Sequence, residues 1–212
     1  MYATLALNAK FWHVLIAADE MICRQVQRAG CPWCGGPLDR GDYERKPRGI
    51  EAALREAFNH RCSTCCRECR KRVTPPSVRF LGRKVYAGAI VMLATIRALV
   101  CGAAPRTLAR WQAWWTTVLP ATTFWQAACA RLVPAVRAES LPAGLLERFE
   151  QARGRAGRQA LVGTLGFLQP VTARLGEQFE GGHWTANFAQ KMHFDGDLRV
   201  LLRSNQIPAR LS

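Results

Sequence analysis

Six of the nine cysteines fall into two short clusters whose spacing is typical of metal ligands. The first cluster is Cys31-Pro-Trp-Cys34, and the two glycines that follow it let backbone amides turn toward the sulfurs. The second cluster spans residues 62–69 and reads Cys-Ser-Thr-Cys-Cys-Arg-Glu-Cys. Two thiolates two residues apart can bind one ion, and two such pairs supply the tetrahedral four-sulfur site that zinc prefers. The sequence therefore predicts one structural zinc ion, Zn²⁺, held in a zinc ribbon.

The second cluster offers two candidate pairs of ligands, Cys62 with Cys65 or Cys66 with Cys69. The later pair is favoured because the basic segment 70–74 follows it directly, as the return strand of a ribbon should. The earlier pair stays open as an alternative. The predicted zinc ligands are Cys31, Cys34, Cys66 and Cys69.

The two pairs lie further apart than in a simple ribbon. Thirty-one residues separate Cys34 from Cys66, whereas the usual spacing is about 15–20 residues. A short inserted helix over residues 50–59 accounts for the excess. The alternative is a set of buried or redox-active thiols, but a redox Cys-x-x-Cys pair needs a strand–helix–strand context that is not visible around Cys31. The remaining cysteines are expected in the core: Cys23, Cys101 and Cys129.

Apolar residues at helical spacing predict a mainly helical chain around this small β element. A helix over residues 11–28, ended by Gly30, is expected to pack beside the ribbon. Helices over residues 83–100 and 105–118, joined by a short turn that contains Gly102, have the order of a helix-turn-helix. Further helices are expected over residues 124–132, 143–152, 158–168 and 171–179.

The predicted fold class is mainly α with a small β zinc ribbon. The expected organisation is an N-terminal helical segment at 1–30, a zinc ribbon with a helical insertion at 31–82, a helix-turn-helix domain at 83–138, a helical region at 139–180 and a C-terminal tail at 181–212. The region 139–180 could dimerise, dock a partner or simply complete the core. The odd cysteine count and the lack of a leader-like N-terminus argue against a secreted disulfide scaffold. The longest apolar run, residues 85–96, is shorter than the roughly 20 residues of a membrane span, so a cytoplasmic, nucleoid-associated protein is expected.

Basic residues outnumber acidic ones and are unevenly distributed. Lys and Arg total 30 against 15 acidic residues, which gives a formal net charge of +15, and 25 of the basic residues are Arg. The planar guanidinium group binds phosphates and guanine edges through paired hydrogen bonds. No acidic residue lies between Glu68 and Glu139, where eleven basic residues occur. Nucleic acid is therefore the expected partner, with an acidic protein or an anionic membrane as alternatives.

The predicted helix over residues 105–118 separates apolar from basic side chains. At 100° per residue, Leu108, Trp111 and Trp115 fall on one side, and Arg106 and Arg110 fall on the other. This pattern favours a recognition helix in a major groove, and the alternative is an ordinary amphipathic helix with a solvated face. The residues predicted to contact DNA are Arg70, Lys71, Arg72, Arg79, Arg83, Lys84, Arg106, Thr107 and Arg110.

Four runs of sequence resemble a family of uncharacterised bacterial proteins encoded near mobile elements: residues 31–36, the second knuckle with Arg70-Lys71-Arg72, residues 74–83 and residues 107–115. The order of zinc ribbon and helix-turn-helix is also similar to the DNA-binding regions of insertion-sequence transposases and their small regulators. This resemblance covers residues 11–170 and implies DNA binding in transposition or DNA recombination. The crowded cysteines of the second cluster depart from the commoner pattern, which leaves the choice of ligands open.

The expected function is that of a non-enzyme. The acidic residues lack the spread spacing of a metal-dependent strand-transfer triad, and four thiolates leave no open coordination position for zinc catalysis. We expect a sequence-specific, double-stranded DNA-binding accessory protein of a mobile element. It would recognise an element end or a target site and position a separate recombinase or transposase. The alternatives are a transcriptional repressor of such an element and an RNA-binding subunit of a ribonucleoprotein.

Overall fold

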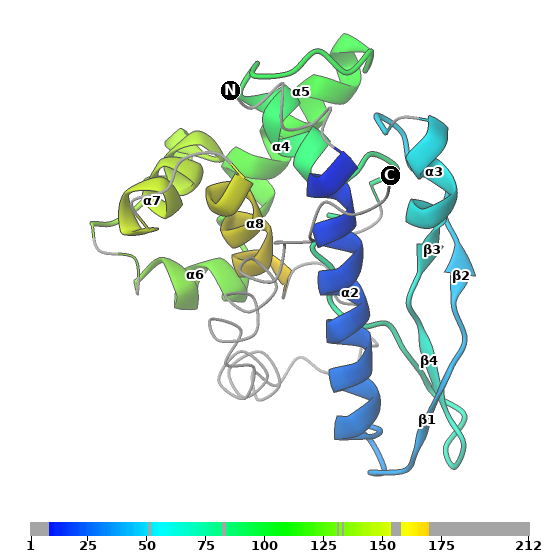
Figure 1. Cartoon of the computed structure of the whole chain (residues 1–212). Helices are drawn as coiled ribbons and strands as arrows, with labels where there is room; N and C mark the ends of the chain where they lie inside the picture. The colour runs from blue at the N-terminus through cyan, green and yellow to red at the C-terminus, as the bar shows by residue number, and fades with distance from the viewer. Residues whose placement is uncertain are drawn as a thin grey trace.

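The computed structural model describes residues 9–50, 52–81, 84–130, 132, 134–153 and 158–169. This part of the chain is mainly helical, with a small antiparallel sheet at one side (Figure 1), as the sequence predicts. The helices are α2 (Ala9–Ala29), α3 (Ala52–Asn59), α4 (Gly88–Thr95), α5 (Pro105–Ala113), α6 (Thr123–Cys129), α7 (Ala143–Arg153) and α8 (Arg158–Phe167). The strands are β1 (Leu38–Arg40), β2 (Tyr43–Glu44), β3 (His60–Arg61), β4 (Thr64–Cys66) and β5 (Arg72–Val73). Two short turns complete the order, the π-helical η1 (Trp114–Val118) after α5 and the 3-10 helical η2 (Ala138–Ser140) before α7.

Helix α2 is the long axis along which the other parts are arranged. Its buried residues recur every three or four positions, for example Leu15, Ala18 and Ile22, so one face packs inward. The 21 residues of α2 correspond to a length of about 31 Å. The ribbon strands run alongside this helix (Figure 1), which confirms the predicted helix over residues 11–28 and its place beside the ribbon.

The strands form one long, interrupted hairpin. Strand β1 pairs antiparallel with β4, which also pairs with β5, and the β2–β3 pair continues the hairpin beyond a short break. The amide of Gly41 donates to the carbonyl of Ser63 at 2.9 Å across that break. Helix α3 connects β2 to β3 at the end away from the cysteine clusters (Figure 1). The predicted inserted helix is therefore confirmed.

A disulfide joins Cys23 of α2 to Cys62 between β3 and β4, with a Cα–Cα distance of 6.2 Å. Both residues are buried, as predicted for Cys23, but we had expected neither to be cross-linked. The bond ties the middle of the ribbon covalently to the helix beside it. Cys101 and Cys129 are only half-buried and lie against the edge of the core.

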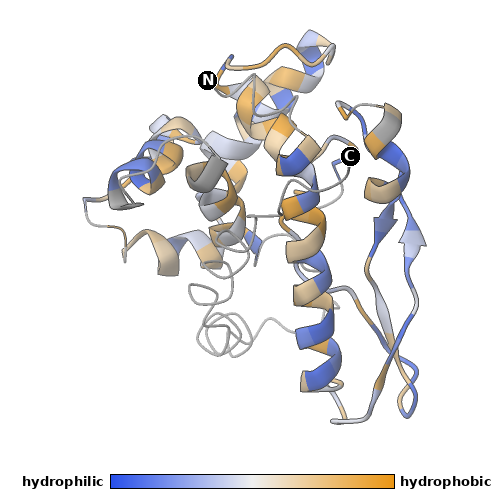
Figure 2. Ribbon diagram, in the orientation of Figure 1, coloured by the Kyte–Doolittle hydropathy of each residue, from blue (hydrophilic) through white to orange (hydrophobic). Residues whose placement is uncertain are grey.

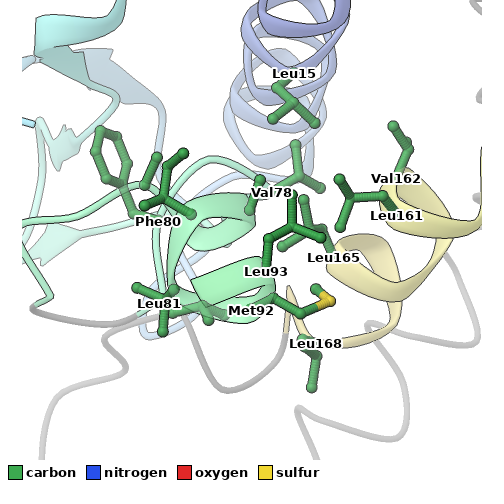
Figure 3. Packing of buried hydrophobic residues seen from close by; sticks show 14 of the residues in the cluster. Leu15, Val78, Phe80, Leu81, Met92, Leu93, Leu161, Val162, Leu165 and Leu168 are labelled. Carbon is green, nitrogen blue, oxygen red and sulfur yellow. The ribbon is translucent and has the colours of Figure 1, made fainter. Parts of the chain in front are cut away.

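The main hydrophobic core contains residues from α2, α4 and α8 (Figure 3). Leu15 of α2, Leu93 of α4 and Leu165 of α8 are almost fully buried and converge there. Helix α4 is apolar on all sides (Figure 2), as expected for a helix surrounded by other elements. The helices after residue 139 thus pack into this core, and the predicted helix over residues 171–179 lies outside the described residues.

The predicted helix-turn-helix appears only as two neighbouring helices, α4 and α5. We expected the first helix over residues 83–100, but α4 is shorter at both ends. Tyr86 and Ala87 instead form isolated β-bridges with Arg48 and Phe80, and Arg97 takes a positive φ of 58° after the helix ends. Residues 96–104 therefore connect α4 to α5. This connection is longer than the turn of a standard helix-turn-helix, which has about three or four residues.

A buried ion pair connects α2 to the segment that precedes α4. The Asp19 carboxylate accepts hydrogen bonds from Arg79 Nε at 2.8 Å, from Ser77 Oγ at 2.5 Å and from the Val78 amide at 2.7 Å. Arg79 also donates to the carbonyl of His60 at 2.6 Å. The predicted role of Arg79 in DNA contact is wrong, because its guanidinium is buried and already bound inside the protein.

Candidate metal centre

The four predicted ligands come together at the free end of the ribbon. Their Sγ atoms all lie within 4.8 Å of one another, with 3.5 Å between Cys31 and Cys69 and 3.4 Å between Cys34 and Cys66. A tetrahedral ion with metal–sulfur bonds of about 2.3 Å places its sulfurs about 3.8 Å apart. The cluster therefore has the size and the donor set of a tetrahedral four-thiolate metal site.

The first pair of ligands sits on a tight turn, the first knuckle, at residues 31–36. The Cys31 amide donates to the Gly36 carbonyl at 2.9 Å, and the Gly35 amide donates to the Cys31 carbonyl at 2.8 Å. Gly35 has a φ of 73°, which favours glycine. The Gly36 amide also donates to the Cys34 sulfur. This geometry directs backbone dipoles at the ligand atoms.

The second pair sits on a matching turn, the second knuckle, at residues 66–71. The Cys66 amide donates to the Lys71 carbonyl at 3.0 Å, and the Arg70 amide donates to the Cys66 carbonyl at 3.1 Å. The Lys71 amide donates to the Cys69 sulfur. Arg70 occupies the position of Gly35 in the first knuckle and has a φ of 59°. The two knuckles are therefore the same structure built on different sequences.

The two knuckles pack tightly against each other, which explains why the first knuckle has a second glycine, Gly36. A Cβ atom added to Gly36 would lie 2.6 Å from the Glu68 side chain and 3.2 Å from the Cys66 sulfur. A small hydrophobic cluster closes the inner side of the centre, and it consists of Val26, Cys31, Leu38, Cys66 and Val73. Trp33 covers this cluster from outside. Water thus reaches the centre mainly from the side of Cys34, which is exposed.

The alternative ligands do not take part. Cys62 is bonded to Cys23, and Cys65 points its sulfur toward the carbonyls of Cys66 and Arg70. Among the described residues, these four cysteines are the one group of three or more His, Cys, Asp or Glu side chains close enough together to share a metal ion. The choice of Cys66 and Cys69 is therefore confirmed as the pair that completes the cluster.

The thiols of the cluster differ in acidity. Burial raises the pKa of Cys66, but hydrogen bonds from the amides of Cys69 and Glu68 and from the Cys34 thiol lower it to about 7. A hydrogen bond from the Lys71 amide lowers the pKa of Cys69, but burial and the neighbouring thiols raise it to about 12. Cys66 therefore has a lower pKa than Cys34 and Cys69, and Cys69 keeps its proton near neutral pH unless a cation lies among the thiols.

Metal affinity is expected to fall as the pH falls. Cys69 is protonated at neutral pH in the metal-free cluster, so an incoming ion must displace its proton. Each displaced proton contributes about a tenfold loss of affinity per pH unit on acidification. Competition with a chromophoric chelator between pH 8 and pH 6 measures this slope. An affinity that does not change over this range would contradict thiolate coordination.

The residues predicted to contact DNA fall into two separate groups. Arg70, Lys71 and Arg72 are exposed at the knuckle end of the ribbon. Arg106 and Arg110 are exposed on α5, near the opposite end of α2 (Figure 1). Two others are only partly exposed, Lys84 and Thr107, and Arg83 lies outside the described residues.

Sequence reasoning missed two features of this region. The disulfide partner of Cys62 could not be recognised, because Cys23 lies on a helix far away in the sequence. The left-handed backbone at Arg70 had a usable signal, because Gly35 stands at the same distance from its own cysteine pair.

Comparisons of the chain with protein-family models, with curated proteins and with solved structures give no match. Among the described residues, no helix has both the length and the apolar character needed to cross a membrane. The fold and the site define a class, a mainly helical protein with a small antiparallel sheet and a four-cysteine cluster that could bind a metal ion.

Proposed function

We propose that this chain is a sequence-specific, double-stranded DNA-binding accessory protein of a mobile genetic element. In this proposal it recognises an element end or a target site and positions a separate recombinase or transposase. The ion in the four-cysteine cluster is a structural zinc, since four thiolates favour zinc and leave no position for a substrate.

The observation that carries the proposal is the division of α5 into two faces. Trp111 of α5 and Trp115 of η1, which follows directly, are 5% and 0% exposed and hold this segment against the core. Arg106, Arg110 and the small Ala113 lie on the exposed side. Two arginines one turn apart, with small neighbours, can enter a major groove and address adjacent base pairs.

The surroundings of α5 add positive potential. The Lys84 ammonium lies 3.8 Å from the centre of the Trp114 ring, at the base of the helix. Burial, with a smaller contribution from the positive charge of Arg110, lowers the pKa of Lys84 to about 8. Lys84 is thus charged below that pH and attracts an anionic partner to α5. Its side chain is only partly exposed, whereas Arg106 and Arg110 are exposed.

The ribbon end is the second contact in this proposal. A non-glycine residue in the left-handed region costs about 1 kcal/mol or more, and Arg70 takes this conformation at a position that locally favours glycine. A role of the Arg70 side chain on a phosphate would explain this choice. Arg72 is exposed on β5 beside it. Contacts of this kind position a protein on DNA but do not read sequence.

Replacing Arg110 with glutamine is expected to reduce the preference for the specific site, while non-specific binding is largely retained. An arginine fork on guanine contributes about 1–3 kcal/mol of discrimination, which corresponds to roughly 5- to 150-fold. Sites selected from a random duplex pool provide the specific and scrambled duplexes for the binding comparison.

Arg72→Gln is the matched control, because a lost phosphate contact weakens binding to all sequences alike. Circular dichroism checks that both variants fold. The proposal is contradicted if the Arg110 variant keeps its full sequence ratio, or if wild-type affinity hardly changes with salt. The RNA-binding alternative is favoured instead if single strands or structured RNA bind more tightly than duplex DNA.

A further inference from the structure

A cleft of about 530 Å³ lies where the ribbon meets α3. Its lining residues are Lys46, Pro47, Arg48, Gly49, Arg55 and Asn59. Three of these six residues are cations, and none is acidic. A concave site with convergent positive charge is suited to a compact anion.

The backbone around the cleft is firmly held. The Arg48 amide donates to the Val85 carbonyl at 2.9 Å, which straps the loop to the segment before α4. Gly49 has a φ of 81°, and an added Cβ atom there would lie 2.9 Å from the Ile90 side chain. On the other side, the Arg45 amide donates to the Asn59 carbonyl at 2.7 Å. The cationic side chains therefore project from fixed positions.

The cations of the cleft differ from other arginines of the ribbon. Arg40 and Arg67 form ion pairs with Asp42 and Asp39 at 2.7 and 2.8 Å. Within the described residues, the structure shows no ion pair for the three cations of the cleft, Lys46, Arg48 and Arg55. Their charges are available to a ligand.

Asn59 adds a hydrogen-bonding side chain to the lining of the cleft. Its Oδ1 atom is buried and has no hydrogen-bond partner among the described residues. A ligand in the open cleft cannot reach an atom with so little accessible surface, so the group of Asn59 that it can contact is the side-chain NH2. Asn59 follows Arg55 by one helical turn, which places both residues on the same face of α3. An anion whose oxygens accept hydrogen bonds from the three cations and from the Asn59 NH2, such as a phosphate group, fits this lining.

We propose that this cleft binds a phosphate group, supplied either by a nucleic acid or by a free phosphate compound. Arg48, Arg55 and Lys46 neutralise the charge, and the Asn59 side-chain NH2 donates a hydrogen bond to a phosphate oxygen. None of these residues belongs to the metal centre or to the surfaces proposed for DNA recognition, so the inference does not depend on the proposed function.

Titration of the full-length, metal-loaded protein with pyrophosphate tests the proposal, with sodium chloride added to keep the ionic strength constant. Saturable binding is expected by calorimetry, with shifts of the Gly49 and Asn59 amide signals in NMR spectra. Arg55→Gln is expected to weaken binding at least about tenfold, because a charge-assisted contact is lost. Arg28→Gln, an exposed change near the end of α2, is the matched control and should bind like wild type. Non-saturable binding, or wild-type affinity in the Arg55 variant, would overturn the proposal.

A second arm identifies the source of the phosphate. If nucleic acid supplies it, pyrophosphate competes with duplex DNA, and Arg55→Gln weakens binding to specific and scrambled duplexes alike. If a free compound supplies it, the Arg55 variant binds DNA normally and loses only pyrophosphate affinity. A protein that binds pyrophosphate but no DNA would contradict the DNA-binding function and leave the phosphate site supported.

Discussion

Replacing Cys66 with serine is expected to abolish metal binding and to unfold the knuckle end of the ribbon. Cys66 is fully buried, pairs with Leu38 across the sheet and contributes a sulfur to the cluster. A serine hydroxyl is a poor ligand for an ion that prefers thiolates. Loss of a residue that merely orients a ligand weakens metal binding about 10- to 100-fold, so loss of the ligand itself should exceed this. Elemental analysis should find about one zinc per wild-type chain and none in the variant.

Cys65→Ser is the matched control, since Cys65 neighbours Cys66 but stays outside the cluster. It should retain one ion and the dispersed amide signals of residues 31–40 and 64–73. A Cys66 variant that keeps its metal would show that the ligand set is wrong. A wild-type protein that folds fully without any metal would remove the structural role assigned to the ion.

Replacing Asp19 with alanine is expected to destabilise the whole fold by about 3–5 kcal/mol. The side chains of Asp19 and Arg79 are 1% and 6% exposed, so the variant leaves a guanidinium charge buried without its carboxylate. The Ser77 hydroxyl and the Val78 amide lose their acceptor as well. For a chain of this length, such a change lowers the melting temperature by roughly 10 °C or more. Thermal and urea unfolding measure it.

The neighbouring residue of the same helix provides the control. Glu20 pairs with Arg40 and Arg24 at the surface, and exposed pairs contribute at most about 1 kcal/mol. Glu20→Ala should therefore leave the melting temperature nearly unchanged. Replacing Asp19 and Arg79 together with apolar residues should recover part of the lost stability, because the Arg79 charge is removed with its partner, whereas the buried Arg61 still loses the nearby Asp19 charge. A single Asp19 variant as stable as wild type would show that the buried pair contributes nothing.

Local patterns predicted much of the fold. The stripe of α2 has a clear helical period, and the excess spacing between the cysteine pairs correctly indicated α3. The run over residues 85–96 is apolar on every side, so periodicity could not locate the ends of α4. The start of α4 depends on bridges to Arg48 and Phe80, which are contacts made only in the folded chain, and its end is followed by the left-handed Arg97.

The same distinction applies to the site. The pair Cys66 and Cys69 could be chosen because the strand that follows it is a local signal. The burial of Arg79 could not be predicted, because its partner Asp19 lies 60 positions earlier. A basic residue in an acid-free stretch is expected at the surface. The cleft beside α3 was also missed. Lys46 follows β2 and Arg55 lies on α3, and only the folded chain brings the two side chains to one cleft.

The disulfide lies on the boundary between two regions that should unfold separately. Toward the knuckles, the chain is held by the four-cysteine cluster and its own small hydrophobic cluster. Toward α3, Leu54 and Phe58 belong to the main core. Because Cys62 is anchored to α2 between them, fraying that starts at an emptied metal centre is expected to stop at this cross-link. Removal of the metal with a chelator should then allow amide hydrogen exchange at the knuckle end only. Removal of the metal together with reduction of the disulfide should extend exchange into β3 and α3.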